Sequence, residues 1–214
     1  REFYRLARSR LKDGGFMTQW LPLYQVSQEV GLSMVRAFLE VFPDAVLLSG
    51  MQKELILMGR ASTTAVIDPD RLSLRLAGAP RVRSDLERMK MGTLTEILGT
   101  FVAHGEDLRR ATRRVEPVTD DNRSMEYGMF SKFSDTRLPR DLFHVEGIAA
   151  WCPGCYEKGR PRPGIGPLRE YLAAQDLMYR SDAFLFFRRA WGSMGGSDVD
   201  FIDRDGRLGT VVSR

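Results

Sequence analysis

The first part of the chain changes from a helical to an extended pattern of hydrophobic positions. Residues 1–12 place apolar side chains near helical spacing among basic ones, which predicts the end of a helix. Gly14 and Gly15 follow and are expected to terminate this helix. The apolar run 16–21 then predicts a short strand, with the polar Gln19 near its end.

A second helix and two more strands are predicted next. Ser27 is suited to cap a helix over 28–42, whose apolar side chains form a single stripe that Pro43 ends. Residues 45–48 and 54–58 predict two strands, joined by a turn long enough for a hairpin. Up to residue 60 the order is therefore helix, strand, helix, strand, strand, which indicates an α/β fold.

The pattern becomes helical after Arg60. Thr93 and Glu96 form the sequence signature of a capping box, so we expect a helix over 94–103. From Gly192 onward the chain is rich in Gly, Asp and Arg, and we expect a mobile tail. The other predicted helices are a short piece starting at 68–70 and the segments 80–90, 106–114, 140–151 and 167–189.

Composition narrows the class of protein. With 43% hydrophobic and 28% charged residues, the chain is typical of globular rather than disordered proteins. No apolar run approaches the roughly 20 residues of a membrane helix. The net charge of +4 comes from arginine clusters that no nucleic-acid reading module accompanies, so solvated helix faces are favoured. Because the chain opens inside a predicted helix, we expect it to be a piece of a longer protein.

Two segments resemble a known family. Residues 2–27, EFYRLARSRLKDGGFMTQWLPLYQVS, look like the strand-five region of the spermidine synthase-like aminopropyltransferases. Residues 119–127, TDDNRSMEY, are similar to the N-T-D-D-R-P-x-I-E-Y segment of that family's membrane-associated and fused members. The second match departs at Val118, which replaces the usual Asn, and at Asn122-Arg123-Ser124, which replaces R-P-x. The resemblance covers roughly residues 1–130.

The resemblance implies a partial Rossmann-like methyltransferase fold, consisting of its last strands and helices, followed by a helical extension. It divides the chain into four segments. Residues 1–67 would be the C-terminal part of the Rossmann-like domain, and 68–135 a helical appendage with the loop that closes it. Residues 136–191 would be a helical extension, and 192–214 the mobile tail.

The resemblance also implies a reaction. Family members transfer an aminopropyl group from decarboxylated S-adenosylmethionine, the co-substrate, to putrescine, with no further cofactor and no metal. Their Gly-rich nucleoside loop, ribose-binding acid and catalytic Asp lie before the strand at Phe16, and no G-x-G-x-x-G stretch occurs here. We therefore expect this chain alone to be inactive. The alternatives are a non-catalytic polyamine- or nucleoside-binding module of a membrane-fused relative and an S-adenosylmethionine-dependent methyltransferase.

The expected partner is a polyamine, with no nucleic acid, and a homodimer is the expected assembly. The expected location is the cytoplasm, or a membrane surface through a segment outside this chain. Substrate-binding residues follow from the resemblance: Gln19 beside the acceptor pocket, and Asp120 and Asp121 at its entrance. Each has a structural alternative, because Gln19 can be a solvated strand end and Asp commonly stabilises turns.

Other side chains carry weaker signals. Trp20 and Tyr24 flank the strand end and are favoured as core residues. Glu126 and Tyr127 are expected to anchor their loop. Further candidate residues are Cys152 and Cys155 in a C-x-x-C pair, His104 and His144, and the acidic run Asp198, Asp200, Asp203 and Asp205. The cysteines lack the βαβ context of a redox motif and the ligand number of a zinc site, so reduced structural thiols are favoured. The acidic run misses the spacing of a calcium loop.

Overall fold

The computed structural model describes residues 1–21, 26–49, 55–61, 66–89, 91–122 and 142–173, and the backbone of 184–186, 198–202 and 208–212. The chain is mixed α/β and divides into two compact units. Unit 1 comprises Arg1–Ala65 and Val102–Trp151, and unit 2 comprises Val66–Phe101 and Cys152–Arg214. Within the described ranges, no helix combines the length and hydrophobicity needed to cross a membrane.

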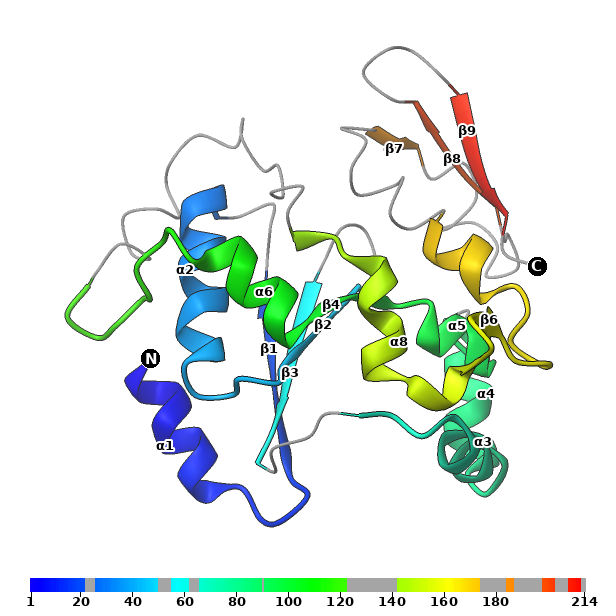
Figure 1. The fold of residues 1–214 in the computed structure, drawn as a ribbon, viewed down its shortest axis with the longest axis horizontal. Coiled ribbons are helices and arrows are strands. Elements are labelled where there is room, and N and C mark those ends of the chain that lie inside the picture. The colour runs from blue at the N-terminus through cyan, green and yellow to red at the C-terminus, as the bar shows by residue number, and fades with distance from the viewer. Residues whose placement is uncertain are drawn as a thin grey trace. The chain divides into compact units, whose positions relative to one another are not determined.

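A four-stranded sheet organises unit 1 (Figure 1). Its order is β1-β3-β2-β4, formed by β1 (Phe16–Leu21), β3 (Leu55–Arg60), β2 (Val46–Ser49) and β4 (Phe101–His104). The strand β3 runs antiparallel to both β1 and β2, so the two strands that flank β3 point in the same direction. The strand predicted over 16–21 and the predicted hairpin are therefore confirmed.

Helix α2 (Gln28–Leu39) covers one face of this sheet. The Ser27 hydroxyl caps it by accepting from the Val30 amide, as the sequence predicts. Its apolar stripe is buried, and the stripe continues through Phe42 beyond the helix end. On the facing strand β3, Leu55, Leu57 and Gly59 are buried while the alternate residues are partly exposed. This alternation is the period-2 pattern of a strand with one covered face.

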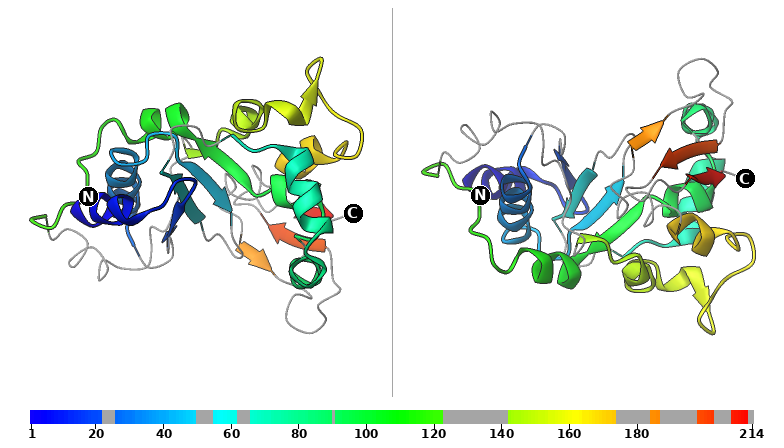
Figure 2. Two further views of the ribbon diagram at one scale, coloured as in Figure 1. Left: turned by 90° about the horizontal axis from the view of Figure 1, so that it is seen from below. Right: turned by 90° about the horizontal axis from the view of Figure 1, so that it is seen from above.

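Two further helices complete unit 1. Helix α1 (Glu2–Arg10) packs on α2 through the buried ring of Tyr4, which meets Phe38 edge-on at a centroid distance of 5.0 Å. Figure 2 shows α1 and α2 together on one side of the β1–β3 pair. Helix α6 (Gly105–Thr112) packs beside α2 and follows β4 directly, where the Gly105 amide donates to the Ala45 carbonyl. The short turns η2 (Val145–Gly147) and α8 (Ile148–Trp151) end the unit's second segment.

Unit 2 consists of short helices around a small core. These are α3 (Pro69–Ala77), α4 (Pro80–Arg88), α5 (Leu94–Leu98) and a helical stretch over 168–173. Asp68 caps α3 with Pro69 in its first turn, and Thr93 with Glu96 forms the predicted capping box of α5. The core residues of this unit include Leu98, Phe101, Cys152, Cys155, Ile165, Leu168 and Leu172.

Small β elements follow. The 3₁₀ turn η3 (Pro153–Cys155) leads into a hairpin of β5 (Tyr156–Glu157) and β6 (Arg160–Pro161). A separate three-stranded antiparallel sheet is formed by β7 (Phe184–Phe186), β8 (Asp198–Ile202) and β9 (Leu208–Val212).

Several predicted helices are wrong in part. The helix expected over 94–103 ends at Leu98, and Phe101–His104 forms strand β4, whose first three residues are buried, because this segment pairs with β2 at the edge of the sheet. In the described part of the helix expected over 140–151, only a 3₁₀ residue at Leu142, η2 and α8 are helical. Within 167–189, helix is described at 168–173 only, and the aromatic run Phe184–Phe186 is a strand. The tail expected from Gly192 contains β8 and β9, and its mobility stays a prediction.

The packing of β3 on the segment that follows α2 can be tested at Gly59. A Cβ added at Gly59 would lie 2.5 Å from Phe42, inside van der Waals contact. We expect Gly59→Ala to lower the free energy of unfolding by about 1–3 kcal/mol, because a buried ring must move to admit the methyl group. Urea unfolding measures this. Gly166→Ala is the matched control, since a Cβ there has nothing within 4 Å. Equal unfolding midpoints for the two variants would contradict the packing described.

Candidate functional site

The first turn of α1 gathers chain segments that are far apart in sequence. The backbone nitrogen of Arg1 donates to the Val118 carbonyl at 2.8 Å, and the Asp120 amide donates to Glu2 Oε2 at 3.2 Å. The Val118 amide in turn donates to the Ser33 carbonyl of α2 at 3.2 Å. These bonds hold residues 118–122 against the start of α1, within unit 1.

The same helix contacts the end of strand β1. The Tyr4 hydroxyl donates to Gln19 Oε1 at 3.3 Å, and Gln19 Nε2 donates to the Trp20 carbonyl at 2.8 Å. Helix α1 therefore brings Gln19 and the Asp120 segment to one element, through Tyr4 and Glu2 respectively. We define this group, Glu2, Tyr4, Gln19, Asp120 and Asp121, as the α1 site.

The two aspartates lie on a tight turn. The Asn122 amide donates to the Thr119 carbonyl at 3.1 Å and to Thr119 Oγ1 at 3.2 Å, which closes a four-residue turn with Asp120 and Asp121 at its centre. Both aspartates are exposed, and within the described residues neither forms an ion pair. The turn that the sequence offered as the structural alternative is present, and its carboxylates face solvent.

Electrostatics distinguish the two α1 side chains that hold the site. The pKa of Glu2 is lowered to about 2, mainly by the bond from its own backbone N–H, with further bonds from Arg1 and the Asp120 amide. A carboxylate at a helix N-terminus is also favoured by the helix dipole. Burial raises the pKa of Tyr4 to about 12, because the ionised phenolate would lose its hydration. The site thus presents a firmly ionised carboxylate beside a firmly neutral phenol.

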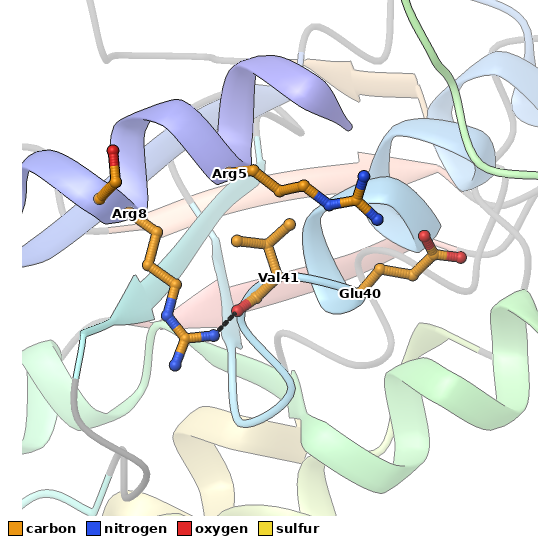
Figure 3. A pocket seen from close by; sticks show the side chains of 5 residues that line it. Arg5, Arg8, Glu40 and Val41 are labelled. Carbon is orange, nitrogen blue, oxygen red and sulfur yellow. Dashed lines mark hydrogen bonds between the residues drawn. The ribbon is translucent and has the colours of Figure 1, made fainter.

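A separate pocket of about 500 Å³ lies between α1 and the C-terminal end of α2 (Figure 3). It is lined by Arg5, Arg8, Ser9, Glu40 and Val41. Arg8 donates to the Val41 carbonyl, and Glu40 pairs with Arg1 and Arg36 at 3.5 and 3.7 Å. From the sequence these arginines were expected on a solvated helix face. The spacing of Arg5 and Arg8, one helical turn apart, is the signal that could have placed both on one wall.

The other candidate residues named from the sequence do not gather at one site within the described structure. Trp20 is 43% exposed, so it is not the core residue that was expected. Tyr24, Glu126 and Tyr127 lie outside the described residues, as do the side chains of the acidic run from Asp198. Cys152 and Cys155 form a disulfide, with Cα atoms 5.3 Å apart, which corrects the expectation of reduced thiols. The four-residue spacing brings the two sulfurs together at the turn η3.

Neither histidine belongs to the α1 site. The His144 amide donates to the Val102 carbonyl beside β4, and His104 ends that strand. In the part of the chain that the structure describes, no three His, Cys, Asp or Glu side chains come together as metal ligands would. Comparison with protein-family profiles, curated proteins and solved structures finds no match for this chain.

The arrangement of the α1 site suits the binding of a cation rather than the catalysis of proton transfer. Its carboxylates are solvent-facing or firmly ionised, and its phenol stays neutral over the physiological range. A general base works best with a pKa near the operating pH, which Glu2 does not have. Ionised carboxylates around a turn attract an amine electrostatically.

The lowered pKa of Glu2 predicts a pH-dependent contribution to stability. Its ionised form is favoured by folding, so this contribution is present above the ordinary pKa of about 4.5 and is lost as the pH falls through about 2. We expect the wild type to exceed Glu2→Gln in free energy of unfolding by a constant amount above about pH 4.5, and that margin to shrink toward pH 2. Chemical unfolding across this range measures it, with the exposed Glu146→Gln as control. A margin that is independent of pH would refute the assignment.

The raised pKa of Tyr4 predicts the opposite dependence at high pH. The unfolded chain ionises this phenol near pH 10 and the folded chain near 12, so the stabilisation is lost as the pH rises through that interval. Between about pH 10 and pH 12, we expect the free energy of unfolding of the wild type to fall by about 2–3 kcal/mol relative to that of Tyr4→Phe. Tyrosinate absorbance with urea unfolding provides the measurement. Parallel stability curves for both proteins would show that Tyr4 titrates like an exposed tyrosine.

Proposed function

We propose that this chain is the acceptor-side part of a spermidine synthase-like protein that transfers an aminopropyl group from decarboxylated S-adenosylmethionine to putrescine. One observation carries the proposal: helix α1, which belongs to the first segment on which the resemblance rests, is hydrogen-bonded to the second segment. Tyr4 reaches Gln19 of the first segment, and Glu2 accepts from the Asp120 amide of the second. The segments are about a hundred residues apart in the chain, and their contact is what a shared acceptor site requires.

In this proposal the polyamine lies against the exposed turn 119–122. Asp120 and Asp121 attract its ammonium groups, since carboxylates suit a diamine that carries positive charge. Gln19 positions one end of the acceptor through its side-chain amide, and Tyr4 fixes that amide by donating to Oε1. Glu2 holds the turn in place through the Asp120 amide. The donor site and the catalytic Asp belong to the part of the family fold that precedes the strand at Phe16.

The architecture of unit 1 is compatible with the Rossmann-like fold that the proposal requires. The resemblance implies that the last two strands form an antiparallel pair, and β2 with β3 is such a pair. Helix α2 precedes this pair and covers its inner face. The strand β1 ends next to α1, which is where the proposal needs Gln19. The fourth strand, β4, is an addition that the resemblance does not predict.

A second candidate is a non-catalytic polyamine-binding module. The observation that favours it is the direction of the Glu2 shift. The pKa of Glu2 is lowered through bonds from its own backbone amide, from Arg1 and from the Asp120 amide. Carboxylates of this kind bind cations but make poor general bases. The two candidates share the α1 site and differ in whether a nucleoside donor binds as well.

The decisive test is calorimetry with spermidine, methylthioadenosine and S-adenosylmethionine as separate titrants. The chain as given is used for the polyamine and the complete gene product for the nucleosides. Spermidine with methylthioadenosine binding supports the aminopropyltransferase, and spermidine alone supports the binding module. Binding of S-adenosylmethionine without spermidine would favour a methyltransferase. Absence of all binding would remove both proposals.

The α1 site makes a specific prediction for the polyamine titration. We expect the double variant Asp120→Asn, Asp121→Asn to weaken spermidine binding by roughly tenfold at low ionic strength, because two exposed carboxylates near the ligand are lost. The effect should shrink at about 1 M salt, where charges are screened within about 3 Å. Glu146→Gln, an exposed carboxylate elsewhere in unit 1, should leave binding unchanged. Equal losses in both variants would indicate nonspecific attraction.

A further inference from the structure

The Cys152–Cys155 disulfide joins the two ends of the turn η3 in unit 2. The two sulfurs belong to fully buried residues, while Pro153 and Gly154 between them are exposed. The two-residue loop that the disulfide closes is therefore exposed, although the cysteines themselves are not. Closing so short a loop costs little entropy, so the bond re-forms readily after it is broken.

The hairpin that follows fixes Arg162 opposite this turn. Lys158 and Gly159 have φ values of 49° and 74°, which is the left-handed pair that a tight two-residue hairpin requires. The β5–β6 ladder continues to the disulfide, since the Arg162 amide donates to the Cys155 carbonyl at 3.0 Å. The backbone position of Arg162 thus depends directly on the conformation of Cys155.

The Arg162 side chain links the turn to helix α3. Its Nη1 donates to the Gly154 carbonyl and to Asp70 Oδ2, both at 3.1 Å, and Nη2 donates to Asp70 Oδ1. The guanidinium therefore spans from the middle of the C-x-x-C loop to the first turn of α3. The loop also packs on that turn directly, because a Cβ at Gly154 would lie 3.2 Å from Pro69 Cδ.

We infer that the Cys152–Cys155 pair is a reversible redox site whose state sets the attachment of the η3 turn to helix α3. In the disulfide form the turn is closed, and the Gly154 carbonyl is held where it accepts from Arg162 Nη1 while the same guanidinium donates to Asp70. In the dithiol form the sulfur atoms must separate to non-bonded distance inside a packed core. The turn opens, and the Gly154–Arg162–Asp70 link is lost.

The chemistry requires a dithiol reductant. One of its thiolates attacks a cysteine sulfur, forms a mixed disulfide and releases the other cysteine as a thiolate that takes up a proton. The reductant's second thiolate then attacks the reductant's own sulfur in the mixed disulfide, which expels the first cysteine as a thiolate that takes up a proton, and the reductant leaves as a cyclic disulfide. In total the protein gains two electrons and two protons, and the reductant loses them. The site is independent of the proposed function, which rests on unit 1.

The test compares oxidised and dithiothreitol-treated full chain under native conditions. Thiol titration is expected to find none in the oxidised protein and the full pair after treatment, and the disulfide should return when the reductant is removed. Hydrogen exchange should then be faster by about fivefold in the reduced protein for peptides covering both 152–162 and 69–77. That factor corresponds to the upper range for an exposed ion pair.

Three variants test whether the redox state of the disulfide acts on helix α3 or only on the turn η3. Arg162→Gln keeps the disulfide but cuts the link, so exchange in 69–77 should be fast in both redox states. Arg160→Gln, an exposed arginine on the same hairpin, should behave as wild type. A Cys152→Ser, Cys155→Ser double variant should match the reduced wild type. Cysteines that never pair, a disulfide reducible only after urea unfolding, or equal exchange of 69–77 in both states would overturn the inference.

Discussion

The packing of the α2 stripe on strand β3 is the contact on which the rest of unit 1 depends. Phe38 and Phe42 lie fully buried between the helix and the strand, with ring centroids 4.8 Å apart. The buried side of β3 supplies Leu55 and Leu57, and Gly59 leaves room for the Phe42 ring. Tyr4 then packs on Phe38, so the position of α1, and with it the α1 site, is set by the same aromatic cluster.

Local signals predicted the elements whose own residues determine them. The strand over 16–21 and the cap at Ser27 follow from period and capping chemistry, and both are present as expected. The capping box at Thr93 was also right about where α5 begins. It could not show where α5 ends, because Phe101–His104 joins the sheet only when β2 is beside it. Pairing between strands distant in sequence leaves no mark in a local pattern.

The same division applies to the candidate site. The turn at Asp120 and Asp121 follows from residue type, since Asp favours turns, and Thr119 closes it. The contact of that turn with Glu2, and of Gln19 with Tyr4, depends on α1 packing and is not readable from spacing. The arginine-lined pocket was missed for the same reason, because Val41 and Glu40 come from the end of another helix. The disulfide was missed because spacing alone does not report oxidation.

Each unit uses one acidic side chain in the first turn of a helix to hold a distant segment. Glu2 of α1 accepts from the Asp120 amide, and Asp70 of α3 accepts the fork of Arg162. Both carboxylates are substantially exposed, so these contacts contribute little to global stability. Their effect is positional: they select one arrangement for a loop that the hydrophobic core does not reach. Contacts of this strength can be broken without unfolding the core, which is what a binding loop or a redox-dependent turn requires.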